Sequence, residues 1–248
     1  MRQRLKTRGN SKRFPITNRI QGLAQGSDEF PSIFEGRYEA RLARSSIETV
    51  SALRLRHEVF TVELGSGPAG DERNGIEFDE FDFRCRHLIV IDRETGGTVG
   101  TYRLNTLETA GSVDGFYSAN EFTIEKLPGE ILEKGIEVGR ACIAKEHRNT
   151  KVLYLLWKAL VRHQEHSGKR FFFGCCSVFT RDSSVGVVAY RRLRNDGLVN
   201  DDFDVVPKKN ALFIDEAGPI AGPEELPALS ASGLACMGVR CSMLNSGR

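Results

Sequence analysis

The sequence lacks any long apolar run. No window approaches the roughly 18 consecutive apolar residues that a membrane-spanning helix needs, so we expect no transmembrane segment. The basic residues near the N-terminus are not followed by an apolar stretch, and we therefore expect no secretory signal peptide. Both absences favour a location in the cytoplasm.

The chain as a whole has no large excess of positive or negative charge. The 35 basic and 33 acidic side chains give a formal charge of +2, so the protein is not a polycation. Residues 1–20, however, hold seven basic side chains and no acid. We expect residues 1–33 to be a mobile basic arm that attracts an acidic protein or an anionic membrane, or that only keeps the chain in solution. Nucleic acid is a weaker expectation, because no aromatic residues are interleaved with the basic ones.

Cysteine is sparse and follows no disulfide or metal-binding pattern. Six cysteines in 248 residues fit reduced thiols better than a disulfide framework. The pair Cys175-Cys176 lies in an apolar run and is expected in the core. His163 with His166, and Cys236 with Cys241, make no complete set of metal ligands, so we expect no bound metal.

The chain divides into three zones by composition. After the basic arm, residues 34–215 show strong hydrophobic periodicity, and residues 216–248 are rich in Ala, Gly, Pro and Ser. The middle zone predicts an α/β (α+β) domain, a mixed sheet with helices on its faces. The predicted strands are 38–43, 87–92, 98–104, 136–143, 170–179 and one or two within 203–214. The predicted helices are one that begins at a capping box of Ser45 and Glu48 and runs through Phe60, one over 150–166 and one over 183–196.

Several charged residues stand within these apolar elements. A charge in a buried strand is costly unless an opposite charge pairs with it. Arg103 and Arg140 therefore need carboxylates, while Asp79, Asp82 and Glu137 need cations. A purely structural ion-pair network and a functional site both explain such a pattern.

One spacing favours a functional site. Alternate residues of a strand face opposite sides, so Glu137 and Arg140 should point away from each other. A bulge at Gly139 would bring both to one face, and bulges re-aim side chains beside active sites. It would also free backbone N–H groups for a developing oxyanion. A carboxylate, a guanidinium and free amides on one strand suit the transfer of an acyl group to an amine.

Together these segments resemble the GNAT-superfamily acyltransferases that take acyl chains from acyl carrier protein. Acyl-homoserine lactone synthases and ornithine N-alpha-acyltransferases share an Arg-x-x-x-Phe helix, an Asp-x-x-Asp loop, a strand ending in Arg-Leu and a Glu-x-x-Arg strand. The matching residues here are Arg56/Phe60, Asp79/Asp82, Arg103/Leu104 and Glu137/Arg140. The resemblance covers about residues 38–180. It implies a GNAT-like, mostly antiparallel sheet with helices on both faces and a splayed, bulged central strand.

Finer features divide between the two branches. Cys85-x-His87-Leu88, Gly115-Phe-Tyr-Ser118 and Phe173-Gly-Cys175 look like the ornithine branch. Asn74-Gly-Ile-Glu-Phe-Asp79 is similar to the lactone synthases, and residues 216–248 depart from both. The resemblance thus implies acyl carrier protein as donor, no further cofactor, and an amino-acid acceptor, with ornithine favoured over S-adenosylmethionine. A non-catalytic module that binds a carrier protein or lipid is the alternative from another class.

The resemblance also implies roles for residues. Glu137 is the candidate base that takes a proton from the attacking amine, and Arg140 lies beside it; a salt bridge from Glu137 to Arg103 or Arg140 is the structural alternative. We expect five residues to order the loop after the first helix and to bind the acceptor: Arg56, Phe60, Asp79, Asp82 and Arg103.

The donor side has weaker candidates. Ordinary GNAT acetyltransferases cradle the coenzyme A pyrophosphate in a glycine-rich turn, whereas residues 146–151 contain no glycine. Arg148, Asn149 and Lys151 are expected to hold the single phosphate of a carrier-protein phosphopantetheine, or simply to cap the next helix. Trp157, Phe172 and Phe173 are candidates to line an acyl pocket, with ordinary core packing as the alternative.

Overall fold

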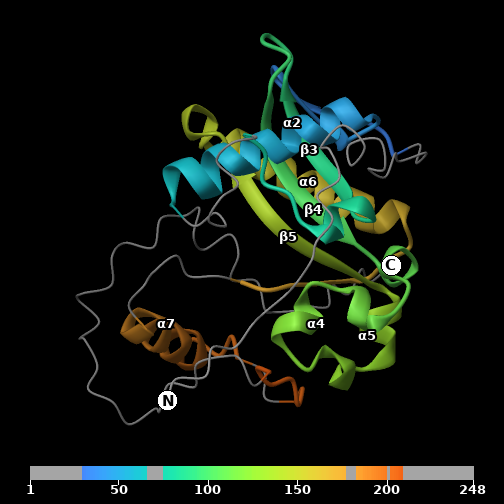
Figure 1. Cartoon of the computed structure of the whole chain (residues 1–248), viewed down its shortest axis with the longest axis vertical. Helices are drawn as coiled ribbons and strands as arrows, with labels where there is room; N and C mark the ends of the chain where they lie inside the picture. The colour runs from blue at the N-terminus through green and yellow to red at the C-terminus, as the bar shows by residue number, and fades with distance from the viewer. Residues whose placement is uncertain (1–29, 66–74, 177–182, 200–201, 209–248) are drawn as a thin grey trace, which may run out of the picture.

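The computed structural model describes residues 30–65, 75–176, 183–199 and 202–208. Its centre is a six-stranded sheet with the strands in chain order across it (Figure 1). Neighbouring strands are antiparallel except for the last pair, which is parallel. The predicted mixed, mostly antiparallel sheet is therefore confirmed. The strands are β1 (Ile33–Glu35), β2 (Tyr38–Leu42), β3 (Arg86–Asp92), β4 (Thr98–Asn105), β5 (Gly135–Ile143) and β6 (Phe171–Phe173).

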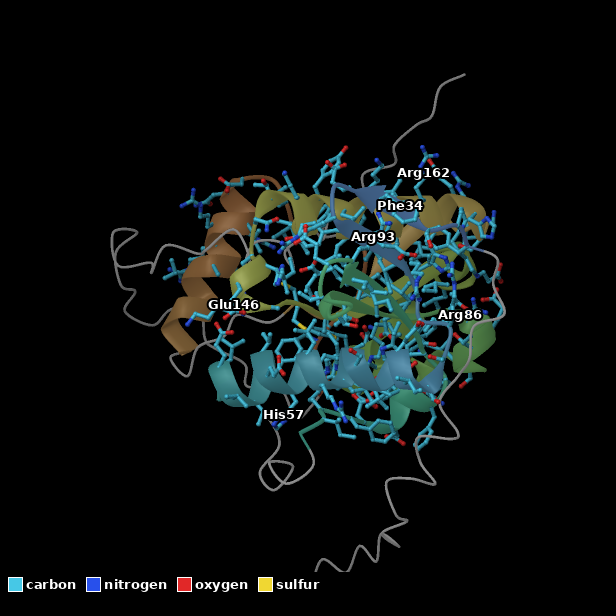
Figure 2. All side chains as sticks on the ribbon, turned by 90° about the horizontal axis from the view of Figure 1, so that it is seen from above. Phe34, His57, Arg86, Arg93, Glu146 and Arg162 are labelled. Carbon is cyan, nitrogen blue, oxygen red and sulfur yellow. The ribbon has the colours of Figure 1, made fainter. Side chains whose placement is uncertain are left out.

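Helices cover both faces of the sheet (Figure 2). Leu88 and Val90 of β3 pack toward α6 (Thr150–His166), in the main hydrophobic core. Ile89, between them, points to the other face and packs with Ala52 of α2 (Ser46–Arg56). This alternation is the two-residue period of a strand that is buried on both sides. No helix among the described residues has the length and apolar content to cross a bilayer.

Short helical segments complete the domain. Between β4 and β5, five of them enclose a second hydrophobic cluster around Phe116. All the short segments, in chain order, are η1 (His57–Glu63), η2 (Glu80–Phe83), α3 (Leu107–Ala110), η3 (Val113–Gly115), α4 (Ser118–Glu121), η4 (Ile124–Lys126), α5 (Gly129–Glu133) and η5 (Lys145–His147). The helix α7 (Ser183–Asn195) is longer.

The first helix begins and ends in an unusual way. The Ser45 hydroxyl accepts a hydrogen bond from Glu48 N at 3.3 Å, but the Glu48 carboxylate accepts from Arg44 N rather than from Ser45 N. The predicted capping box is thus only half formed. At its other end α2 passes directly into the π-helix η1, which contains Phe60. A π-turn adds a residue to the helical turn and re-aims side chains, often at functional sites.

A bulge interrupts the pairing of β5 with β4. Arg103 pairs with Gly139 and Thr101 pairs with Cys142, so Tyr102 alone lies opposite residues 140 and 141. The bulge expected at Gly139 is therefore one position further on. Arg140 has a φ of 50° and is the non-glycine residue with positive φ among the described positions. Such a conformation costs about 1–3 kcal/mol and is typical of functional sites.

The pairing of β5 with β6 is short. Register pairs run only from Gly135↔Phe171 to Glu137↔Phe173. Gly174 then passes close to Val138, because a Cβ on Gly174 would lie 2.2 Å from the Val138 carbonyl oxygen. Beyond this contact no described strand pairs with the rest of β5 on this edge. The strand predicted over 170–179 is thus too long, because β6 covers only 171–173 of residues 170–176. Residues 177–179 lie outside the described residues.

Two other predictions differ from the structure or fall outside it. The closing strands predicted within 203–214 are wrong for residues 202–208, where the structure has only an isolated bridge between Phe122 and Pro207. Residues 209–214, the tail 216–248 and residues 1–29 of the arm lie outside the described residues.

Candidate active site

A buried ion-pair network joins α2, the loop before η2 and β4. Arg56, which is fully buried, binds both carboxylate oxygens of Asp82, with Nη1–Oδ1 at 2.6 Å and Nη2–Oδ2 at 3.2 Å. Its Nε donates to Glu77. Arg103 donates to Asp79 at 2.6 Å and lies 3.4 Å from Asp82. Asp82 is therefore shared by two guanidinium groups.

The local sequence fixes where these acids stand. Asp79 is the N-cap of η2: its Oδ1 accepts from Phe81 N at 2.9 Å, while Asp82 Oδ2 accepts from Asp79 N at 2.8 Å. This reciprocal capping box holds both carboxylates at one turn. Burial alone would raise the pKa of Asp82, but the guanidinium groups of Arg56 and Arg103 hold it well below its ordinary value.

Arg140 closes the network at its solvent edge. The bulge turns its guanidinium to the α2 face of the sheet, where Nη2 lies 3.4 Å from Glu77 and 3.7 Å from Asp79. The Arg140 side chain is 33% exposed and that of Asp79 is 25% exposed, whereas Arg56 and Asp82 are sealed. Three guanidinium groups thus contact three carboxylates. Arg140 and Asp79, the partly exposed residue of each charge, form the rim of the network.

Glu137 takes a different kind of partner. Its carboxylate accepts hydrogen bonds from two backbone N–H groups, Ser118 N at 2.7 Å and Tyr117 N at 3.1 Å. The structural alternative, a salt bridge from Glu137 to Arg103 or Arg140, is not what the structure shows for this carboxylate. Glu137 fixes the segment that leads into α4.

Tyr117 links the two parts of the site. Its ring centroid lies 5.7 Å from the guanidinium carbons of both Arg103 and Arg140. These are cation–π distances. Because the backbone N–H of Tyr117 also binds Glu137, the Glu137 and Arg140 side chains meet at one residue on one face of β5. This confirms the expectation that a bulge brings them to the same side.

Two further side chains border the cluster. His87 is fully buried, and burial lowers its pKa to about 4 although Asp82 lies 3.7 Å away and opposes that shift. It is therefore neutral near pH 7. Cys175 follows β6 and lies near Ser118 and Glu137; burial raises the pKa of its thiol to about 11. Cys175 is half-buried and Cys176 exposed, so the prediction that this pair is core packing is wrong for Cys176.

The candidate donor residues are not gathered into an open site. Arg148 forms a bidentate ion pair with Glu63, with Nη1–Oε1 at 2.6 Å, and its Nε donates to the Ile143 carbonyl. The Asn149 side chain is the N-cap of α6 and accepts from Val152 N at 3.0 Å. Lys151 is exposed in the first turn of α6.

The three aromatic residues expected in an acyl pocket do not share one. Trp157 is 47% exposed on the outer side of α6. Phe172 packs against the main core, whereas Phe173 packs with its ring 5.1 Å from that of Phe116, in the cluster on the other face. Adjacent residues of a strand face opposite sides, so Phe172 and Phe173 could not have lined one slot.

Sequence reasoning missed Glu77, Tyr117 and Cys175 as members of the cluster. Glu77 is the second carboxylate of Arg56 and the nearest acid to Arg140. Its signal was present, since residues 77, 79 and 82 place three acids within one short loop. Phe60, expected to help order the loop and bind the acceptor, is buried, and the Arg140 guanidinium stands 6.0 Å from its ring centroid.

Comparison with known proteins agrees with this geometry. Residues 55–158 match the family model of the acetyltransferase (GNAT) domain. This stretch runs from the end of α2 to the first half of α6 and includes the bulged strand.

Sequence similarity to individual proteins is more specific than the match to the domain family. The chain is 33% identical over 181 residues to an L-ornithine N(alpha)-acyltransferase of Agrobacterium fabrum (strain C58 / ATCC 33970), covering 69% of this chain and 61% of that protein. It is 36% identical over 149 residues to the protein of the same name in Rhizobium meliloti (strain 1021), covering 56% and 49%. The chain thus spans less than two thirds of the length of these relatives. Among solved structures, the AHL synthase LasI is 13% identical, with 66% of this chain and 79% of that chain covered and a TM-score of 0.42.

Proposed function

We propose that the protein is an N-acyltransferase that moves a fatty acyl chain, such as a 3-hydroxyacyl chain, from acyl carrier protein to the α-amine of an amino acid, with ornithine as the favoured acceptor. Similarity to relatives named L-ornithine N(alpha)-acyltransferase supports the acceptor class. The observation that carries the proposal is the rim pair, Arg140 and Asp79, a half-exposed cation and carboxylate beside the bulged strand.

The acceptor binds at this rim. Arg56 is sealed and fully engaged, and Arg103 is buried and already paired with Asp79 and Asp82. Arg140 is the exposed guanidinium of the network, and its contacts of 3.4 and 3.7 Å are long. An Arg can bind a carboxylate with two parallel hydrogen bonds. We therefore assign the acceptor carboxylate to Arg140 and its side-chain ammonium to Asp79, whose Oδ2 is buried and accepts no hydrogen bond.

The reaction itself needs few groups. The α-amine nitrogen forms a bond to the thioester carbon, the carbon–sulfur bond breaks, and the thiolate leaves and takes up a proton as the carrier's free thiol. Glu137 receives the amine proton through a water, because each of its oxygens keeps a lone pair beyond the N–H bond it accepts. N–H groups of β5 past the short pairing with β6 bind the carbonyl oxygen as charge develops on it.

The network behind the rim positions these groups. Arg56, Asp82 and Arg103 hold the loop that carries Asp79, and Phe60 supports the Arg140 guanidinium. On the donor side, Lys151 is the free candidate for the phosphopantetheine phosphate, since Arg148 and Asn149 are engaged elsewhere. No further cofactor enters this scheme.

The location proposed is the cytoplasm, with peripheral contact at the inner face of the membrane. Acyl carrier protein is the proposed donor partner, and the proposed product carries a fatty chain. The basic arm of residues 1–20 has the charge to attract either an acidic carrier or an anionic membrane.

The test is a turnover assay with purified protein, 3-hydroxyacyl carrier protein and ornithine. Thiol release should accompany a product with the mass of N-acyl-ornithine. If S-adenosylmethionine is the acceptor instead, the products are an acyl-homoserine lactone and methylthioadenosine, and the acceptor assignment is wrong. Carrier binding without turnover of any amine would overturn the enzymatic proposal altogether.

A further inference from the structure

The outer side of α6 does not have the composition of a solvent-facing surface. Its inner side is buried in the main core through residues such as Leu155, Leu156 and Ala159. A surface helix with such an inner side normally has polar residues on the other. Here the outer side exposes three large apolar or aromatic side chains, Tyr154 (63% exposed), Trp157 (47%) and Val161 (39%).

These three residues form one line. Positions i, i+3 and i+7 lie on the same side of an α-helix, and Tyr154 to Val161 covers about 10 Å along its axis. Isolated exposed apolar residues are common, but a contiguous exposed group on one element marks an interaction surface. We call Tyr154, Trp157 and Val161 the apolar line of α6.

Basic residues lie along one side of the line. Lys151 and Arg162 are exposed and Lys158 is half-buried, all on the outward side of α6, and Figure 2 shows Arg162 at the outer edge of the molecule. The helix has a single acid, Glu165, which lies 3.3 Å from Arg162 and pairs with it. The outer face thus combines an apolar line with a positively charged border on one side.

We propose that the outer face of α6 binds the surface of an anionic membrane. Trp and Tyr favour the boundary between headgroups and acyl chains, where the ring is apolar and its N–H or O–H reaches water. Lys and Arg extend their apolar stems along such a surface while their charges meet lipid phosphates. A helix with an apolar centre and basic residues beside it lies in the plane of the membrane–water interface. The inference rests on the proposed function only in that a lipid-forming enzyme gains from release of its product at a membrane.

An acidic carrier protein is the competing partner for a basic, apolar surface. The convex side of a single helix favours the membrane, because the apolar line is its central ridge and the charges lie beside it. A flat bilayer can then bury the ridge while its anionic headgroups meet the basic residues beside it. The two partners make different predictions for Trp157.

The chain offers a direct probe, because Trp157 is its single tryptophan. The full-length protein is mixed with vesicles of phosphatidylglycerol and phosphatidylcholine, or of phosphatidylcholine alone. The anionic vesicles should shift the Trp157 emission to the blue, brominated lipids should quench it, and added salt should weaken both effects. Because this readout needs no turnover, it separates failure of the surface from failure of the enzyme.

Matched variants localise the binding. Lys158→Gln with Arg162→Gln should weaken vesicle binding about 25-fold, since each basic residue near an anionic surface contributes about fivefold. The control, Arg44→Gln with Arg54→Gln, removes two exposed charges outside α6, Arg54 on α2 and Arg44 just before that helix, and should leave binding within about twofold of wild type. Equal losses in both variants would overturn the proposal.

Other outcomes also decide against it. Vesicle binding without any change in Trp157 emission would assign the contact to another segment, such as the basic arm. An emission that is already blue-shifted without vesicles and unchanged by them would mean that the chain itself covers the face. A response of Trp157 to acyl carrier protein but not to vesicles would identify the carrier as the partner.

Discussion

Glu137 and Arg140 lie on one face of β5 and meet at Tyr117. Glu137 accepts the backbone N–H of Tyr117, and the Arg140 guanidinium stands 5.7 Å from the centroid of its ring. In an uninterrupted strand these residues, three apart, would face opposite sides. The extra residue of the bulge, with Arg140 at a φ of 50°, therefore creates the juxtaposition on which the proposed acceptor site depends.

The network around Arg56 should dominate stability. Arg56→Leu leaves the buried carboxylates of Asp82 and Glu77 with only their 3.4 Å ion-pair contacts to Arg103 and Arg140 and should lower the free energy of unfolding by roughly 3–5 kcal/mol. The matched control is Arg148→Leu, which also removes a bidentate partner of a carboxylate but at a site where both side chains are 30% exposed. The expected loss there is about 0–1 kcal/mol. Urea denaturation of both variants measures the difference, and equal losses would contradict a buried structural network.

His87 should make the protein sensitive to mild acid. Its pKa is about 4 in the folded state, against an ordinary value of 6.5, so the unfolded chain binds the proton first as pH falls. Stability is therefore lost between pH 6.5 and pH 4, by about 3 kcal/mol for this residue. The loss from Asp82, whose pKa is lowered, comes only at more acidic pH.

The measurement is the free energy of unfolding across that window for wild type and His87→Gln. The variant should have a flatter profile between pH 6.5 and pH 4, whatever its stability at pH 7. Parallel profiles would mean that His87 takes up its proton equally well in the folded state.

Glu137 should hold the segment before α4 in place. Glu137→Ala removes the acceptor for the N–H groups of Tyr117 and Ser118, and their amide hydrogens should exchange at least tenfold faster because a buried N–H without a partner costs about 1–3 kcal/mol. In the control Glu121→Ala, which loses only a 3.4 Å contact with the Tyr117 hydroxyl, both amides should keep their protection. Hydrogen exchange read at these two amides tests the positioning role separately from turnover. Unchanged exchange in Glu137→Ala would rule that role out.

The close approach of β6 to β5 should tolerate no side chain at Gly174. A Cβ there would lie 2.2 Å from the Val138 carbonyl oxygen. Gly174→Ala should therefore destabilise the fold by about 1–3 kcal/mol, or several degrees in Tm. Gly139→Ala has open space around its Cβ and no positive φ, and its Tm should change by less than about 2 °C. Thermal unfolding compares the two, and an unchanged Tm for Gly174→Ala would mean that the strands are not so close.

Much of the fold could be predicted because its main elements have strong local signals. Helix 150–166 was predicted at its observed bounds, and the strand predicted over 136–143 differs from β5 by one residue. The elements that were missed are weak locally. β1 has only three residues, and the π-helix 57–63 continues the apolar spacing of α2, so no sequence pattern separates it.

The residues of the site could be predicted in outline, but not which residues pair with one another. Charges inside apolar elements identified Arg103, Arg140 and Glu137, because a buried charge needs a partner. Which carboxylate each cation meets is a tertiary property, so Glu77 was not found and Glu137 was not assigned its backbone donors. The pairing of Phe172 with Phe173 in one pocket was an avoidable error, since the two-residue period of a strand already separates them.

The central claim is that Arg140 binds the carboxylate of the amino-acid acceptor, and steady-state kinetics of Arg140→Gln test it most directly. Loss of a charge-assisted hydrogen bond of about 1.5–3 kcal/mol predicts a KM for ornithine raised at least tenfold, a KM for acyl carrier protein changed little, and a control Arg148→Gln with an unaltered KM for ornithine. An Arg140→Gln enzyme that retains the wild-type KM for ornithine would contradict the account.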